Sequence, residues 1–179
     1  MRTFIFVIGL MATASAFAQH QHQTPAQSGY AGMQTRDIKA LSTEQLADLR
    51  DGNGMGASLP AELNGVPGPL HVLQLKDRLD VTLEQQLRLE RITAEMKAEA
   101  KRLGQDIVAS ETDLDRSFKS GKADEAFVRA MTARIAELQG QLRAAHLIAH
   151  LKTKQMLSDQ QVVAYNQARG YAAGNQHMP

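Results

Sequence analysis

Cysteine and tryptophan are absent from this chain of 179 residues, and other aromatic residues are few, with three Tyr and five Phe. The absence of cysteine excludes disulfides, thiolate metal ligands and a cysteine nucleophile. So few aromatic rings do not favour a compact core built on large side chains. A composition rich in Ala, Leu, Gln, Glu, Lys and Arg is instead typical of long helices packed through Leu, Ile, Met and Ala. The composition therefore predicts an all-α fold.

An apolar run long enough to cross a bilayer is also missing, although a short one opens the chain. Residues 1–18 combine Arg2, an apolar run over 4–11 and the small-residue ending Ala16-Phe17-Ala18. These features are typical of a secretory signal peptide, and the run is too short for a permanent membrane anchor. We therefore expect an exported, periplasmic protein that is cleaved after Ala18.

The sequence also lacks an excess of charge of either sign. It has 20 Lys and Arg against 19 Asp and Glu, and cleavage after Ala18 removes only Arg2 from this balance. Nucleic acid is therefore not an expected partner, because phosphate binding requires a basic surface.

Sequence signatures of catalysis are missing as well. There is no Gly-rich phosphate loop and no nucleophile elbow, and the carboxylates lie beside Lys and Arg as they do on solvated helix faces. ATP is scarce outside the cytoplasm, so no cofactor is expected to be required. We predict that the protein is not an enzyme and that it binds other proteins or metals.

The mature chain is predicted to comprise a disordered tail (19–36), a short helix with a Gly/Pro-rich loop (37–69), a helical domain (70–170) and a flexible tail (171–179). The short helix is expected over 37–50. Residues 51–69 hold five Gly and three Pro, so no regular helix is expected there.

One local pattern occurs three times: an apolar residue, then a Ser or Thr, then a Gln three positions after the hydroxyl residue. This is a capping box, in which the hydroxyl accepts from the third helical amide and the Gln reaches back to the cap amide. It predicts helix starts at residues 42, 82 and 158. The three copies are Leu41, Ser42 and Gln45; Val81, Thr82 and Gln85; and Leu157, Ser158 and Gln161.

Two long apolar stripes follow the second start, with Ser120–Asp124 as a break between them and Asp124 as the expected cap of the second helix. They predict a long antiparallel helical hairpin with short flanking helices. A lone pair of such helices leaves apolar surface uncovered, so we expect a dimeric cradle. The stripes are Leu89, Ile92, Met96, Leu103, Ile107, Leu114 and Phe118, then Phe127, Met131, Ile135, Leu138, Leu142, Ala145 and Ala149.

The capping boxes at 81–85 and 157–161 bracket this hairpin in a chain that carries an export signal. In these respects residues 70–170 resemble the LTxxQ-motif family of periplasmic stress proteins, which includes Spy, CpxP, ZraP and CnrX-like members. Val81 and Ser158 depart from the consensus but keep the capping chemistry. The resemblance implies a small all-α protein, often dimeric, with a curved helical cradle.

Members of this family differ in function. Spy-like members hold unfolded clients without ATP, CpxP-like members also restrain a stress-sensing kinase, and others bind Zn, Ni, Co or Cu. The resemblance implies a periplasmic chaperone and stress-response protein whose partners are unfolded or misfolded proteins, with a membrane stress sensor as a further partner. The alternative is a heavy-metal-binding sensor or buffer.

The chaperone interpretation agrees with the pattern of the predicted helices. An amphipathic surface with Met and Leu among dispersed charges can bind varied clients, because Met side chains repack easily. The other interpretation is that these apolar residues form an ordinary core. The candidate client-binding residues are Leu89, Ile92, Met96, Leu103, Met131 and Ile135.

The metal alternative depends on His146 and His150, which lie four positions apart and so share one face of a helix. Counting outward from the predicted turn places Met96 opposite His146. A His/His/Met set favours Cu, because thioether sulfur is a soft ligand, whereas Glu95 or Glu99 as the third ligand suits Zn, Ni or Co. The other interpretation is that both histidines hydrogen-bond to acids on a neighbouring helix.

Overall fold

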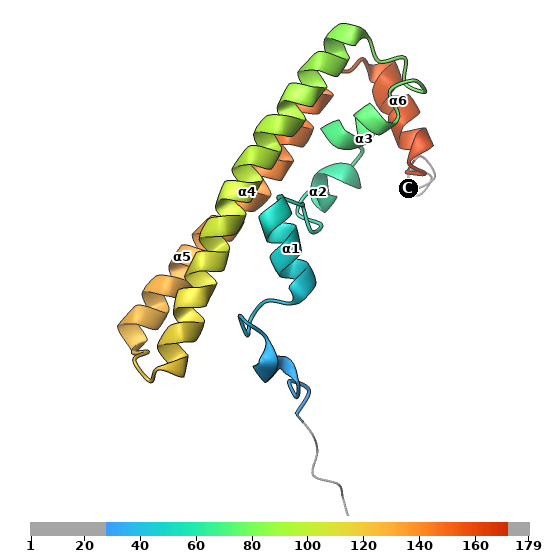
Figure 1. Cartoon of the computed structure of the whole chain (residues 1–179). Helices are drawn as coiled ribbons and strands as arrows, with labels where there is room; N and C mark the ends of the chain where they lie inside the picture. The colour runs from blue at the N-terminus through green and yellow to red at the C-terminus, as the bar shows by residue number, and fades with distance from the viewer. Residues whose placement is uncertain (1–27, 172–179) are drawn as a thin grey trace, which may run out of the picture.

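The computed structural model describes residues 28–171, and every regular element in that range is a helix (Figure 1). The elements are η1 (Met33–Thr35), α1 (Thr43–Asp51), α2 (Leu59–Glu62), α3 (Pro69–Gln74), α4 (Leu83–Lys119), α5 (Glu125–Lys154) and α6 (Asp159–Ala168). The all-α prediction is therefore confirmed for these residues. None of their helices is both long and apolar enough to cross a membrane. The predicted leader, its cleavage site, residues 19–27 of the predicted disordered tail and residues 172–179 of the predicted flexible tail lie outside the described range. Residues 28–36, also expected to be disordered, form hydrogen-bonded turns and η1.

Two long helices, α4 and α5, pack against each other and form the main body of the fold (Figure 1). They have 37 and 30 residues, which corresponds to lengths of about 55 and 45 Å. The turn at 120–124 joins them, with Gly121 at φ 68°. Asp124 caps α5 by accepting a hydrogen bond from the Phe127 amide at 2.8 Å. The predicted break and N-cap are therefore confirmed.

Two buried clusters form the core: the apolar faces of α4 and α5 meet in the first, toward the turn, and the second lies toward α6. The first also takes up residues from the N-terminal segment, and the second joins α3, α4 and α6. The first cluster is Ile38, Leu41, Leu49, Ala100, Leu103, Ile107, Leu138 and Leu142, and the second is Val72, Leu79, Leu89 and Tyr165.

Helix α1 approaches α4 so closely that the two backbones touch at Gly104. A Cβ atom built on Gly104 would lie 2.0 Å from the Leu49 carbonyl oxygen, a distance that no real side chain tolerates. Gly104 is thus a contact surface and not a weak point in the helix. Residues 37–69 therefore pack as part of the same unit as the long helices.

The structure corrects two predictions for the N-terminal half. The helix expected over 37–50 begins only at Thr43, because Ser42 caps it, and the preceding turns bury Ile38 and Leu41. The segment 51–69, expected to lack helix, contains the last residue of α1, all of α2 and the first residue of α3. Pro60 and Pro69 lie in the first turns of these helices, where the missing N–H removes no helical hydrogen bond.

All three predicted capping boxes are present, at Ser42, Thr82 and Ser158. Each hydroxyl accepts a hydrogen bond from the amide of the Gln three residues later, at 3.2 Å in every case. Each Gln side chain in turn accepts a hydrogen bond from the cap amide. The predicted starts at 42, 82 and 158 are thus confirmed.

The second and third capping boxes are also bonded to each other. Gln85 Nε2 donates to the Met156 carbonyl (2.8 Å) and to Gln161 Oε1 (2.9 Å). Gln161 Nε2 donates to the Leu79 carbonyl (3.1 Å) and to Gln85 Oε1 (3.0 Å). Each amide therefore caps its own helix and also ties the start of α4 to the start of α6. Gln45 is exposed and makes only its capping bonds to the described residues.

Candidate functional site

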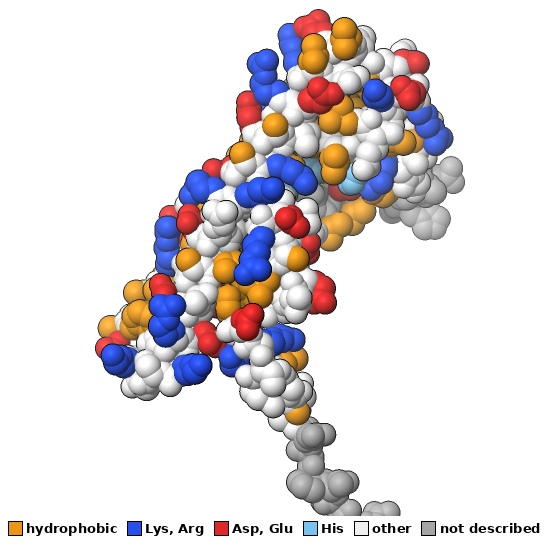
Figure 2. All heavy atoms as spheres, in the orientation of Figure 1, with side chains coloured by type: hydrophobic (Ala, Val, Ile, Leu, Met, Phe, Trp, Pro, Cys, Tyr) orange, Lys and Arg blue, Asp and Glu red, His pale blue; other side chains and the backbone are white. Residues whose placement is uncertain are grey.

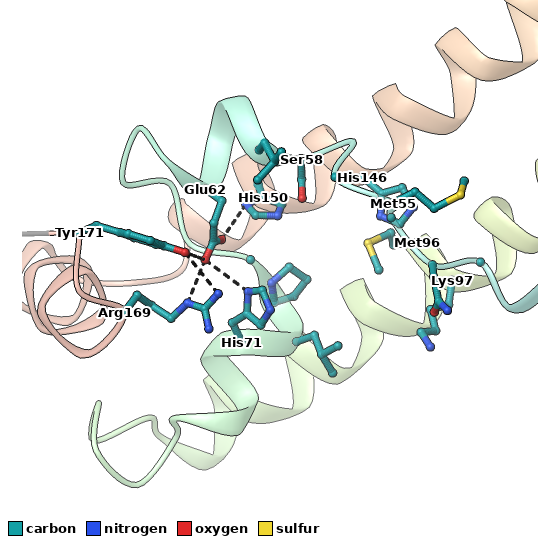
Figure 3. Close-up of a pocket in the computed structure, with 18 residues that line it drawn as sticks. Met55, Ser58, Glu62, His71, Met96, Lys97, His146, His150, Arg169 and Tyr171 are labelled. Carbon is teal, nitrogen blue, oxygen red and sulfur yellow. Dashed lines mark hydrogen bonds and ion pairs between the residues drawn. The ribbon is translucent and has the colours of Figure 1, made fainter. Parts of the chain in front are cut away.

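A pocket of about 350 Å³ lies between the segment 52–71, the two long helices and the end of α6 (Figure 3). At Gly68 the backbone lies against the ring of His150, since a Cβ atom on Gly68 would lie 2.8 Å from Cε1 of His150. Side chains of two kinds line the pocket. We name them the Glu62 cluster (Glu62, His71, His150, Arg169 and Tyr171) and the methionine cluster (Met55, Met96 and His146).

Glu62, at the end of α2, is a carboxylate with only 5% of its surface exposed. Its Oε1 accepts hydrogen bonds from the hydroxyls of Tyr165 (2.6 Å) and Tyr171 (3.1 Å). The same oxygen accepts from Nε of Arg169 at 3.1 Å, and Nδ1 of His71 lies 3.4 Å away. The carboxylate therefore joins α2 and α3 to the C-terminal end of the described chain.

The surroundings of Glu62 keep it ionised. Burial by itself raises the pKa of this carboxyl, but the Tyr165 hydrogen bond and the charges of His71 and Arg169 outweigh burial and lower the pKa below its usual range. Burial and the nearby carboxylate raise the pKa of Tyr165, so its hydroxyl keeps the proton that it donates. Glu62 Oε2 is buried without a hydrogen-bond partner among the described residues, and Nδ1 of His150 lies 3.8 Å from it.

Replacing the carboxylate by its neutral isostere, Glu62→Gln, is expected to lower the free energy of unfolding by about 2 kcal/mol at neutral pH, because the charge-assisted hydrogen bonds are lost. Since folding depresses the pKa of Glu62, this contribution is present above the unfolded pKa and is lost as the pH falls through the folded value. The difference between wild type and variant should therefore narrow below a pH of 4.5, the usual carboxyl value. Urea unfolding of both proteins, followed by circular dichroism at several pH values, measures this difference in the free energy of unfolding. A difference that stays constant as the pH falls would show that the charge contributes nothing.

In the methionine cluster, His146 is 5% exposed and its Nε2 is buried without a hydrogen-bond partner in the range 28–171. Its ring packs on the turn after α1, since a Cβ atom on Gly54 would lie 3.4 Å from Nδ1. Met55 from that turn and Met96 from α4 line the pocket beside it (Figure 3). Burial lowers the pKa of His146, and the charge of His150 lowers it further. Both effects favour the neutral imidazole.

The two histidines of the predicted metal pair point into different parts of the pocket (Figure 3). Nδ1 of His150 lies 2.8 Å from the Val66 carbonyl oxygen and donates its proton there. His150 is directed toward Glu62, which corresponds to the interpretation of a histidine beside an acid. His146 lies at the other end of the pocket, beside Met96 and the turn that carries Met55.

The residues predicted to lie near His146 and His150 are also found in different places. Met96 lines the pocket together with His146, as the counting predicts. Glu95 and Glu99 line a separate groove between α4 and α5, where Lys152 pairs with Glu95 at 3.6 Å. The structure thus brings together the sulfur and one imidazole of the predicted set, but not the glutamates.

Half of the predicted client-binding side chains are in the core. Leu89, Leu103 and Ile135 are 0%, 1% and 6% exposed, so in this structure they stabilise the helix packing and are not offered to a client. The other three are half-buried and reach the surface: Ile92, Met96 and Met131.

Sequence reasoning missed most of the Glu62 cluster. Glu62 lay in a segment expected to be loop, and Tyr171 lay in the tail expected to be flexible, whereas its hydroxyl donates to Glu62. A signal was present in the two Gly-rich stretches 52–56 and 65–68, which bring backbone close to side chains of α4, α5 and α6. The other contacts of Glu62 could not be predicted from local patterns, because they join residues far apart in the chain. Tyr165, for example, lies 103 positions from Glu62.

Comparison with protein-family models, with curated proteins and with solved structures gives no match for this chain. Between residues 28 and 171 no three side chains of the His, Asp and Glu types are grouped closely enough to hold a metal ion.

Proposed function

We propose that this protein is an exported, ATP-independent chaperone of the LTxxQ type that binds unfolded or misfolded periplasmic proteins on its long helices. The observation that carries this proposal is a groove of about 220 Å³ whose lining, within residues 28–171, comes from α4 and α5. Its floor is apolar, and the charged side chains of Glu95, Glu99 and Lys152 lie at its edge. The apolar lining residues are Ile92, Met96, Ala145, Ile148 and Ala149.

The surface of the long helices supports the same proposal. Hydrophobic side chains there lie in small groups between charges of both signs (Figure 2). Small, mixed patches suit weak contacts with many sequences better than tight contact with one partner. Met96 adds a flexible side chain that can repack around different clients. The large exposed apolar residues of α4 and α5 are Leu83, Leu87, Phe118, Ile148 and Leu151.

Ile148→Lys tests the groove, because Ile148 is 49% exposed and a charge placed there should leave the fold intact. We expect the wild type to suppress light scattering by heat-unfolded malate dehydrogenase without ATP, and the variant to lose about half or more of this effect. Leu63→Lys is the matched control, since Leu63 is 61% exposed and lies outside the groove. Equal suppression by all three proteins would exclude the groove, and no suppression by the wild type would exclude the chaperone function.

The proposal includes the assembly that the resemblance implies: the α4–α5 hairpin of two copies forming a dimeric cradle. The dimer would widen the apolar surface available to a client beyond the groove of one copy. Sedimentation equilibrium should give twice the monomer mass, and a monomer at all concentrations would limit the proposal to the single groove. A membrane stress sensor is the further partner proposed from the resemblance.

A second candidate function is the metal-binding sensor or buffer, with Zn, Ni, Co or Cu as the metal. The observation that favours it is the buried Nε2 of His146, which has no hydrogen-bond partner between residues 28 and 171. Replacing His146 and His150 by Ala separates the two functions, because a chaperone should still suppress client aggregation while a metal protein should lose affinity in a calorimetric titration.

A further inference from the structure

The segment between α1 and α3 contains two Asn-Gly pairs, Asn53-Gly54 and Asn64-Gly65, and the sequence has no others. In such a pair the glycine nitrogen can attack the asparagine side chain, because glycine has no side chain to hinder its approach. The reaction is intramolecular, so the nucleophile is always close to the carbon that it attacks. Both asparagines are exposed. The two pairs therefore have the same chemistry, and the fold decides which of them reacts.

The two pairs differ at the glycine nitrogen, which is the nucleophile. The Gly65 N–H donates a hydrogen bond to the Glu62 carbonyl oxygen at 3.1 Å. The Gly54 N–H donates no backbone hydrogen bond within residues 28–171. A hydrogen-bonded amide must first break its bond before its nitrogen can lose the proton and attack. The Gly54 nitrogen is therefore available in the folded protein, whereas the Gly65 nitrogen is held.

The backbone after each asparagine extends this difference. The three consecutive amides of residues 64–66 all donate to carbonyl oxygens of α2, at distances between 2.9 and 3.2 Å. The amides of residues 54–56 donate no backbone hydrogen bond to the part of the chain that the structure describes. Segments with few backbone hydrogen bonds open locally at a low cost in free energy. Asn53 therefore reaches the geometry for ring closure more often than Asn64.

We propose that Asn53 is a site of spontaneous modification, at which the Gly54 nitrogen attacks the side-chain amide and converts the residue to aspartate or isoaspartate. A bond forms between the Gly54 nitrogen and Cγ of Asn53, the Cγ–Nδ2 bond breaks, and ammonia leaves with the proton of the Gly54 amide. Water then opens the cyclic imide, and the nitrogen regains a proton. Opening at Cγ gives aspartate, and opening at the backbone carbonyl carbon gives isoaspartate, whose main chain runs through the former side chain.

Both products change the wall of the candidate pocket, which Asn53 and Gly54 line. Asn53 Nδ2 donates to Oδ1 of Asp48 at 2.9 Å. A carboxylate at position 53 has no proton to donate, so it would repel the Asp48 carboxylate. Isoaspartate also adds a carbon to the main chain immediately before Gly54, whose backbone packs against the ring of His146. The modification therefore loosens the turn between α1 and α2 where it covers His146.

Peptide mapping by mass spectrometry tests the proposal on the purified protein after storage at mildly alkaline pH. Fragment spectra distinguish Asn53 from Asn64 by the mass gained when an amide becomes a carboxyl group. We expect Asn53 to be modified faster by about fivefold or more, the factor that the hydrogen bond of the Gly65 amide provides. In urea the two rates should become equal, because unfolding frees both glycine nitrogens. Equal rates in the folded protein, faster modification of Asn64, or protection of both would overturn the proposal.

Gly54→Ala tests the nucleophile directly. The added methyl group hinders the approach of the nitrogen, and we expect the modification of Asn53 to slow by about tenfold or more. A Cβ atom at this position would lie 3.4 Å from the His146 ring, which is an ordinary contact, so the fold should survive. Gly140→Ala is the matched control, because Gly140 follows a glutamine, and it should leave the rate at Asn53 unchanged. A wild-type rate in Gly54→Ala would show that water attacks the side chain directly and would refute the mechanism.

Discussion

Gly104→Ala is expected to lower the free energy of unfolding by about 3 kcal/mol, although the same change in the middle of an exposed helix is usually stabilising. The added methyl carbon would lie 2.0 Å from the carbonyl oxygen of Leu49 and 2.7 Å from its carbonyl carbon. Both atoms are backbone, so no side-chain rotation relieves the contact. Helix α1 must move away from α4, which opens the cluster that contains Leu49, Leu103 and Ile107.

Gly140→Ala is the matched control for this experiment. It also lies inside a long helix, but apart from its chain neighbours and the nearby backbone of its own helix, no heavy atom of residues 28–171 is within 4 Å of the Cβ position. Removing a mid-helix Gly there should raise the free energy of unfolding by about 0.5–1 kcal/mol. Urea denaturation followed at 222 nm compares the two variants with the wild type. If Gly104→Ala proved neutral or stabilising, the close approach of α1 to α4 would be disproved.

Gln85→Ala is expected to cost about 3 kcal/mol, whereas Gln45→Ala should cost about 1 kcal/mol, although both remove the same residue from the same capping motif. The Gln85 amide also holds the Met156 carbonyl and both polar atoms of the Gln161 amide. Without it the start of α6 loses its attachment to α4, and partly buried polar groups are left without partners. Gln45 is exposed and supports only its own helix end.

Replacing Gln85 and Gln45 by Glu tests separately the cap and the bonds between α4 and α6. A carboxylate can still accept from the Thr82 amide, so the cap survives, but it cannot donate to Met156 or Gln161. Thermal unfolding should then place Gln85→Glu between the wild type and Gln85→Ala, because the cap and the bond from Gln161 Nε2 survive, and Gln45→Glu close to the wild type. Similar losses at positions 45 and 85 would mean that the cross-link between α4 and α6 contributes nothing.

The features that could be predicted from the sequence are those made by residues close together in the chain. The three capping boxes and the Asp124 cap each lie within four consecutive residues, so their pattern alone located the starts of α1, α4, α5 and α6. Apolar spacing likewise located the buried faces of the two long helices. Met96 beside His146 followed from counting along two such helices, because their rise per residue is regular.

The parts that could not be predicted depend on contacts between distant segments. Residues 51–69 have the composition of a loop, yet α2 forms there because the surrounding helices bury Glu62 and hold it. Met55 lies in a turn whose path no periodic pattern describes. His150 was paired with His146 on spacing alone, and its bond to the Val66 carbonyl is made to a residue 84 positions away.

The separation between Glu62 and its partners also has a consequence for folding kinetics. Tyr165 and Tyr171 follow Glu62 by 103 and 109 positions, whereas a five-residue turn is enough to join α4 to α5. Contacts between distant residues form more slowly than local ones, and a chain made from its N-terminus folds its early parts first. The long helix pair can therefore close before Tyr171 reaches Glu62. The pocket is completed last. A chain that ends before Tyr165 can therefore form the two long helices but cannot give Glu62 its tyrosine partners.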